Sequence, residues 1–217
     1  MVKNQNIFIS VALAVVIIIA VGIYAYANLF NTDETNQIDD ENDINQKNGI
    51  PNETHNEIVL TIIHQGVNHT YNLSNLENMG SYTASGRYIK TKVLPDISLG
   101  NIYTFTGIPL STILEDINIS SNEYQLDVIS TDGWSTTYTM NETLGNVDIY
   151  DITGNITDEK SVIMIIAYKE NGSYYSEIDP NNEIGPLRIA FVGDNTPITP
   201  SGLWAKMVDI VKISYIS

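Results

Sequence analysis

The chain of 217 residues has no cysteine and a formal net charge of −16, with 26 acidic side chains against 10 Lys and Arg. The lack of cysteine excludes thiolate zinc sites, cysteine-ligated iron–sulfur clusters and disulfides. Because nucleic-acid binding depends on neutralising phosphates with Lys and Arg, the charge also argues against a nucleic-acid partner.

Residues Ile7–Ala27 form an uncharged, strongly apolar run of 21 residues. A helix of that length crosses the roughly 30 Å hydrocarbon core of a bilayer. Lys3 precedes the run and acidic residues follow it, so the positive-inside rule places residues 1–6 in the cytoplasm and the rest of the chain outside. A cleaved signal peptide is the alternative, because Ala25-Tyr26-Ala27 fits a signal-peptidase site. The length of the run favours an uncleaved, single-pass anchor in the cell membrane.

Residues 28–56 are polar, acidic and poor in apolar side chains. Such a segment buries too little surface to offset its ordering entropy, so we expect a flexible stalk. From residue 57 on, apolar and β-branched side chains become frequent. The segment 57–217 is long enough for one domain with its own hydrophobic core.

The first half of this domain predicts strands followed by two short helices. Continuous or alternating apolar residues indicate strands at 58–63, 70–73 and, as one strand or two, 82–93. Ser74 is expected to cap a helix that runs through Asn78 and ends at Gly80. Pro109 is expected to occupy the first helical position of a second helix, which closes at Asn118. The apolar face of that helix carries Leu110, Ile113, Leu114 and Ile117.

The second half predicts two hairpins and a central strand. Asp132-Gly133 separates an alternating strand at 124–130 from a partner at 134–139. Another helical turn is expected at 141–144. Residues 161–168 are nearly all apolar, which indicates a central strand, and Asn171-Gly172 follows as the second hairpin turn. Further strands are expected at 187–192 and 208–216. The whole predicts an α+β domain that is mostly β.

Candidate catalytic side chains form no recognisable pattern. The only histidines are His55, His64 and His69, and no G-x-S-x-G motif accompanies them, which argues against a Ser-His-Asp hydrolase. Four acidic residues lie between two predicted strands: Asp148, Asp151, Asp158 and Glu159. They form either a calcium site or a solvated acidic loop. We prefer the loop, because the four residues lack the spacing of an EF-hand.

Seven Asn-x-Ser/Thr sequons occur along the chain. They are either a consequence of an Asn-rich composition or sites of N-glycosylation on an extracytoplasmic glycoprotein. The asparagines are Asn52, Asn68, Asn72, Asn118, Asn141, Asn155 and Asn171.

Five blocks carry a resemblance to a known family over residues 58–213. They are Tyr103-Thr104-Phe105-Thr106-Gly107-Ile108-Pro109-Leu110, Asp132-Gly133-Trp134-Ser135, Ala167-Tyr168-Lys169-Glu170-Asn171-Gly172, Gly185-Pro186-Leu187-Arg188 and Ser201-Gly202-Leu203-Trp204. In this order they resemble the oxidoreductase molybdopterin-binding domain of the sulfite oxidase family. The resemblance implies a mixed α+β, mostly-β fold that holds a molybdenum or tungsten pterin in a cleft.

The matched blocks imply which residues would bind the cofactor: Tyr168, Arg188, Ser201, Gly202 and Lys206. Arg and Lys are suitable donors for the anionic phosphate of a pterin dithiolene. Each residue also has a structural interpretation. Tyr168 and Trp204 would fill the core, and an Arg inside a strand requires an acidic partner or exposure.

The family's metal-ligating cysteine is expected within residues 81–87, where this chain carries hydroxyl residues. A neutral hydroxyl is a poor ligand for such a metal, so we expect no metal site of the cysteine-ligated form and assign no catalytic residue. Three interpretations stay open. The domain binds a pterin or another small ligand without metal–cysteine catalysis, or it is an active molybdopterin-dependent oxidoreductase whose dithiolene alone holds the metal, or it is a structural cell-surface module that contacts a surface or membrane protein.

Overall fold

The structure, a computed structural model, describes residues 57–92, 95–119, 123–159, 162–181 and 183–216. The predicted anchor at Ile7–Ala27, the predicted stalk and the sequon at Asn52 lie outside these residues. Within the described ranges, no helix has both the length and the hydropathy needed to span a bilayer.

The described residues form a mostly-β α+β domain, which confirms the predicted fold class. The helices are α2 (Leu73–Asn78), α3 (Leu110–Asp116), α4 (Met140–Thr143), α5 (Tyr175–Ile178) and the 3₁₀ helix η1 (Ser201–Leu203). The strands are β1 (Ile58–His64), β2 (Val67–Asn72), β3 (Tyr82–Thr91), β4 (Ser98–Leu99), β5 (Tyr103–Pro109), β6 (Tyr124–Ser130), β7 (Ser135–Thr139), β8 (Ile163–Glu170), β9 (Ser173–Tyr174), β10 (Arg188–Val192), β11 (Ile198–Pro200) and β12 (Val208–Tyr215).

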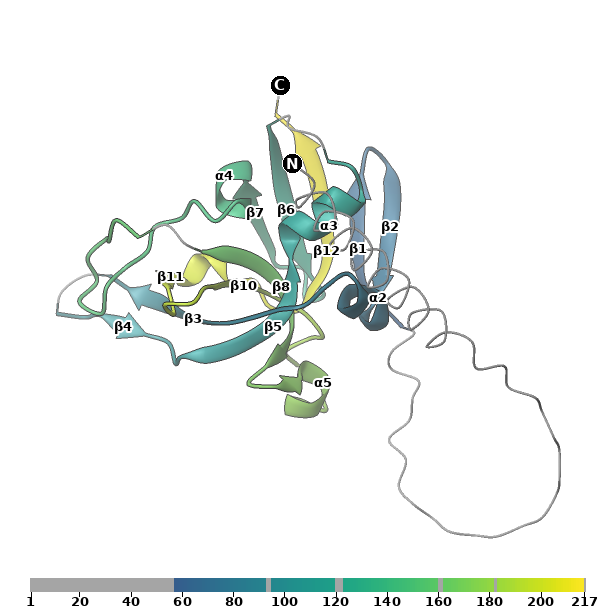
Figure 1. The fold of residues 1–217 in the computed structure, drawn as a ribbon. Coiled ribbons are helices and arrows are strands. Elements are labelled where there is room, and N and C mark those ends of the chain that lie inside the picture. The colour runs from purple at the N-terminus through teal and green to yellow at the C-terminus, as the bar shows by residue number, and fades with distance from the viewer. Residues whose placement is uncertain (1–56, 93–94, 120–122, 160–161, 182, 217) are drawn as a thin grey trace, which may run out of the picture. The chain divides into compact units, whose positions relative to one another are not determined.

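One sheet joins both ends of the domain. Its strand order is β2-β1-β12-β6-β7, with β1 and β12 parallel and the other neighbours antiparallel (Figure 1). Every second residue of β6 is buried, as the alternating sequence predicts, because one face of this sheet covers the core. The C-terminal strand lies between β1 and β6, so the sheet is complete only when the last strand has been inserted.

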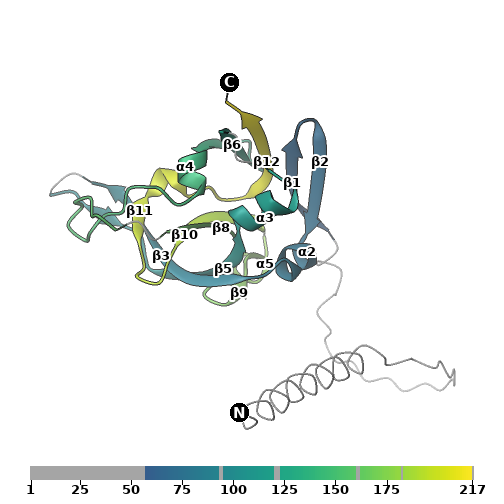
Figure 2. The same cartoon turned by 45° about the horizontal axis from the view of Figure 1, so that its top comes forward.

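The second sheet curls almost into a barrel, as Figure 2 shows. Its main order is β10-β8-β5-β3-β11, and β4 and β9 pair with β3 and β8. Gly193, directly after β10, bridges to Ser85 of β3 and brings the two ends of the curl together. Gly107 of β5 permits close approach, because a Cβ at this position would lie 2.3 Å from the Ile166 carbonyl oxygen of β8.

Strand β8 is buried on both faces, which explains its nearly continuous apolar sequence. Met164, Ile166 and Tyr168 belong to the main core, which lies between the two sheets and against α3. Ile165 and Ala167 point the other way and join a second cluster with Phe105, Ala190 and Val192. The same alternation continues on β10 and decides which side chains can meet.

Two predicted helix starts were wrong by one or two residues. Helix α2 is capped by Asn72 instead of Ser74, because the Asn72 side chain accepts from the Asn75 N–H and the Asn75 side chain accepts from the Asn72 N–H. Pro109 ends β5 at the N-cap position of α3, and Leu110 begins the helix. Proline lacks an N–H in either position, so its sequence signal fits both.

Candidate functional site

The five residues predicted to bind a cofactor lie on three segments. Tyr168 is on β8, Arg188 begins β10, and Ser201 and Gly202 form η1. Lys206 follows η1, and an antiparallel backbone bridge pairs it with Arg188. Helix η1 packs against β3 and β10. The fold therefore gathers four of the five at one end of the curled sheet.

Arg188 is held by an acidic partner and by aromatic rings. Its Nη1 donates to Glu170 Oε2 at 2.7 Å, and the two side chains are only 11% and 15% exposed. The guanidinium carbon lies 5.9 Å from the centre of the Phe105 ring and 5.7 Å from that of Tyr175. The Tyr175 hydroxyl is buried and forms no hydrogen bond of ordinary geometry with the described residues. Arg188 thus has the acidic partner that an arginine inside a strand requires.

Lys206 and Lys90 add positive charge beside this pair. Both are exposed, and Lys90 Nζ lies 5.6 Å from the centre of the Tyr88 ring. Partial burial lowers the pKa of Lys206, and the charges of Arg188 and Lys90 lower it further, while Glu170 opposes them. Arg188, Lys206 and Lys90 are named here the cation cluster, because the charges of Arg188 and Lys90 both act on Lys206, opposed by the carboxylate of Glu170.

Aromatic side chains lie next to the cation cluster, since Lys90 lies over Tyr88 and Arg188 over Phe105. Trp204 packs against Phe105 and Tyr88, with ring centroids 5.4 and 5.6 Å apart. Its indole N–H donates to Thr199 at 2.8 Å, so the polar group of this ring has a partner. Gly86 leaves room for the ring, because a Cβ there would lie 3.0 Å from Trp204 and 2.5 Å from a backbone oxygen.

Tyr168 lies apart from the cation cluster. Arg188 pairs with Ala167, and directly opposed residues of antiparallel strands share a face, so the adjacent Tyr168 points to the opposite face. Tyr168 is 2% exposed and belongs to the main core. A ligand at the cation cluster therefore does not contact Tyr168, whose position agrees with the core interpretation.

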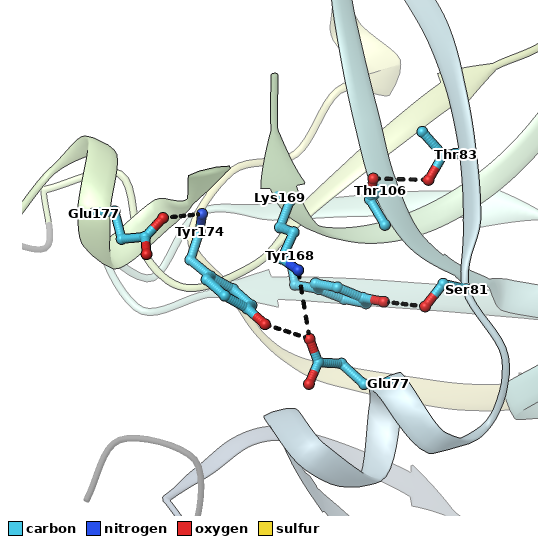
Figure 3. Close-up of polar contacts among 8 residues, drawn as sticks. All are labelled: Glu77, Ser81, Thr83, Thr106, Tyr168, Lys169, Tyr174 and Glu177. Atoms are coloured by element: carbon cyan, nitrogen blue, oxygen red, sulfur yellow. Dashed lines mark hydrogen bonds and ion pairs between the residues drawn. The ribbon is translucent and has the colours of Figure 1, made fainter. Parts of the chain in front are cut away.

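The Tyr168 hydroxyl belongs to a polar network, which Figure 3 shows. It lies 2.5 Å from Ser81 Oγ, in the segment where the family's cysteine is expected. A register shift between β5 and β8 at this point lets Lys169 point to the same face as Tyr168. Tyr174 donates to Glu77 at 2.5 Å, and Lys169 Nζ lies 3.8 Å from the same carboxylate. The network ties α2 to β8 and β9 and satisfies its own polar groups.

Two surface cavities lie elsewhere. One of about 420 Å³ includes Arg87, Tyr150 and Thr196 in its wall. Another of about 320 Å³ is lined by Asn141, Asn146, Val147 and Asp148. Neither cavity is lined by a residue of the cation cluster.

The other sequence candidates are scattered. His64 Nε2 lies 3.1 Å from the Tyr215 hydroxyl, and His69 is on the neighbouring strand β2. In the described ranges no three His, Asp or Glu side chains are arranged to hold a metal ion. The sequon asparagines that the structure describes are exposed, apart from Asn72, which is half-buried. Glycosylation stays a prediction.

Sequence reasoning missed Lys90 and Glu170. Both lie on strands, and one residue of register decides which face a strand side chain occupies. The sequence predicts the Asn171-Gly172 turn, but this turn does not indicate that Glu170 points toward Arg188. The pairing of β8 with β10 was needed for that.

The comparisons with known proteins give little beyond this geometry. No protein-family model and no curated protein matches the chain. Among solved structures, the sulfane dehydrogenase SoxCD from Paracoccus pantotrophus is similar, with a TM-score of 0.49 and 14% sequence identity. The alignment covers 76% of this chain and 39% of that one, so the present chain spans well under half of the length of its structural neighbour.

Proposed function

We propose that this chain is a membrane-anchored, extracytoplasmic domain that binds an anionic ligand at the cation cluster. The apolar run Ile7–Ala27 supports the membrane anchor, and the grouping of Arg188, Lys206 and Lys90 supports the ligand site. A pterin carrying a phosphate is the ligand class that the sequence resemblance favours. The domain would bind this group without the metal–cysteine bond of the sulfite oxidase family.

The supporting observation is the grouping of Arg188, Lys206 and Lys90 in a chain whose net charge is −16. Among the described residues, Glu170 is the carboxylate that acts on Lys206, against the charges of Arg188 and Lys90, so the three cations leave a local excess of positive charge. An excess of this kind costs stability through mutual repulsion, and an anion removes that cost. Arg188 would bind a phosphate through its planar donors, and Lys206 would act as a mobile point charge.

The donor set fits the anionic part of a pterin cofactor. Gly202 is exposed, with open space where a Cβ would lie, so its backbone permits close approach of a ligand beside the cluster. Tyr88 and Trp204 present aromatic rings next to the lysines. Only in the alternative in which the dithiolene holds a metal would the cofactor supply redox chemistry. The residues of this chain would bind and orient the phosphate, and none of them offers the thiolate that holds the metal in the family.

The test is a measurement of bound pterin, molybdenum and tungsten. The full-length chain is purified in mild detergent from a host that synthesises the cofactor, and each component is quantified per mole. We expect pterin to co-purify with the unsubstituted chain and to be lost in Lys206→Met, which removes one cation of the cluster. Lys206 is exposed, so this substitution should leave the fold intact. Lys212→Met removes an exposed lysine of β12 outside the cluster and is the matched control.

The outcomes separate the three interpretations. Pterin without metal supports the proposal. Stoichiometric metal favours an active oxidoreductase whose dithiolene alone holds the metal. If neither pterin nor metal is found, the cofactor is not the ligand, and a structural surface module becomes the better description. Protease added to intact cells should cleave within residues 28–56, and full protection would contradict the proposed orientation.

A further inference from the structure

The larger cavity lies away from the cation cluster, at the side of the domain where β3 and β11 meet a loop. Three segments form its wall: Arg87 of β3 with Ile102, the loop at 149–159, and the turn at 195–198. Its volume of about 420 Å³ is in the range of sites that hold small molecules. The sequence analysis assigned no role to this place.

Arg87 provides the cavity with a positive charge that has no acidic partner. Its Nε donates to the Gly100 carbonyl oxygen at 2.6 Å, which fixes the direction of the side chain. Among the described residues, no carboxylate lies within ion-pair distance of Arg87, and its terminal nitrogens form no hydrogen bond. The planar end of the guanidinium is therefore available for a carboxylate.

Two carboxylates line the same cavity without pairing with Arg87. Asp151 is engaged by its own loop, since it accepts from Thr153 and Asn155, and these hydrogen bonds lower its pKa. Glu159 is exposed, and no side chain of the described residues forms an ion pair or hydrogen bond with it. A simple anion would be attracted by Arg87 and repelled by these groups. A ligand with charges of both signs satisfies all of them.

Four isoleucines lie in the wall among polar residues, a tyrosine and a proline. Ile102 and Ile152 are 58% and 70% exposed, which is unusual for isoleucine, whereas Ile149 and Ile198 are buried behind the surface. Thr196, also in the wall, has a φ of +52°, a strained conformation for a β-branched residue. Backbone strain and exposed apolar side chains at one cavity are typical of a ligand site.

We propose that this cavity binds a small aliphatic zwitterion, an α-amino acid with a branched side chain. Its carboxylate pairs with Arg87, its ammonium group faces Glu159, and its side chain covers Ile102 and Ile152. This inference is independent of the anion site, since the two places share no lining residue and either can fail alone.

The test is calorimetric titration of the full-length chain, in mild detergent, with L-leucine and three analogues. 4-Methylpentanoate keeps the carboxylate and the branched side chain. 3-Methylbutylamine keeps the amine and the branched side chain, and glycine keeps both charges without the side chain. Each analogue loses one contact, so we expect each to bind at least about tenfold more weakly than leucine. Equal affinity for 4-methylpentanoate would overturn the role of Glu159, and no saturable leucine binding at millimolar concentration would overturn the proposal.

Variants test the residues one at a time. Arg87→Met should abolish leucine binding. Glu159→Gln should weaken leucine binding but should strengthen 4-methylpentanoate binding, because it removes a charge that repels the carboxylate. Ile152→Ser should weaken both and stay folded, because Ile152 is on an exposed loop, so this variant carries the test if Arg87→Met does not fold. Lys212→Met is the matched control and should bind normally. Unchanged leucine affinity in Ile152→Ser and Glu159→Gln would refute the site.

Discussion

The ion pair between Arg188 and Glu170 gives the sharpest test of the fold around the anion site. Both side chains are nearly buried and their closest atoms are 2.7 Å apart. Replacing Arg188 with Met leaves the Glu170 carboxylate without its partner in a poorly solvated place. Breaking a buried pair from one side costs about 3–5 kcal/mol, and the residual exposure of 11% and 15% indicates the lower end, about 3 kcal/mol.

The double variant should recover most of this loss. With Met at both positions no charge is left unpaired, and the free energy of unfolding should lie within about 1 kcal/mol of the unsubstituted chain. A double-mutant cycle then gives a coupling of about 2–3 kcal/mol between the two side chains.

Urea unfolding followed by tryptophan fluorescence provides the assay, because Trp204 packs against Phe105, whose ring also contacts Arg188. The slope of the transition should stay constant, so that the midpoint reports stability alone. The reasoning is refuted if Arg188→Met costs less than about 1 kcal/mol, or if the two single effects add within about 0.5 kcal/mol.

Three further outcomes follow from the same geometry. Gly86→Ala should destabilise the domain by about 1–3 kcal/mol and alter the near-UV signal of Trp204, since the added methyl meets a backbone oxygen; an unchanged signal and midpoint would contradict the packing. Asn72→Ala should cost about 1 kcal/mol by removing the cap of α2, whereas Ser74→Ala should change the urea midpoint little. Lys206 should titrate by NMR below the ordinary lysine pKa. The unfolded chain then keeps this proton at pH values where the folded chain has lost it, so the contribution of Lys206 to stability rises with pH through that window. An ordinary pKa for Lys206 would show that Arg188 and Lys90 do not act on it.

Local sequence was a good guide to the strands and hairpins. Alternation at 124–130 predicts β6, and the nearly continuous apolar run at 161–168 predicts a central strand, which the structure shows as β8. The Asp132-Gly133 and Asn171-Gly172 turns both join antiparallel neighbours. Gly133, Asn171 and Gly172 have positive φ, which glycine and asparagine adopt at low cost. Strand β5 carries Gly107 and Pro109 and was recognised only as a motif before a helix.

Among the candidate site residues, sequence indicated Arg188 and Lys206 but not their relation. The bridge between them, and the carboxylate of Glu170 beside them, depend on strand pairings separated by long stretches of chain. Tyr168 matched the same family block as its neighbours, yet it points to the opposite face of the sheet. A residue-by-residue sequence match does not show this difference, because adjacent side chains of a strand point to opposite faces of the sheet unless a β-bulge lies between them.

The sequence by itself determined the absence of cysteine chemistry, the acidic charge, the apolar run at Ile7–Ala27 and a mostly-β domain, since these depend on composition and on patterns of a few residues. Tertiary structure decided which charges meet. The closure of the curled sheet brought three cations together in an acidic chain, and the approach of β3 and β11 to the 149–159 loop placed Arg87 in a cavity with exposed isoleucines. Both arrangements arise from contacts between distant residues, which no local pattern specifies.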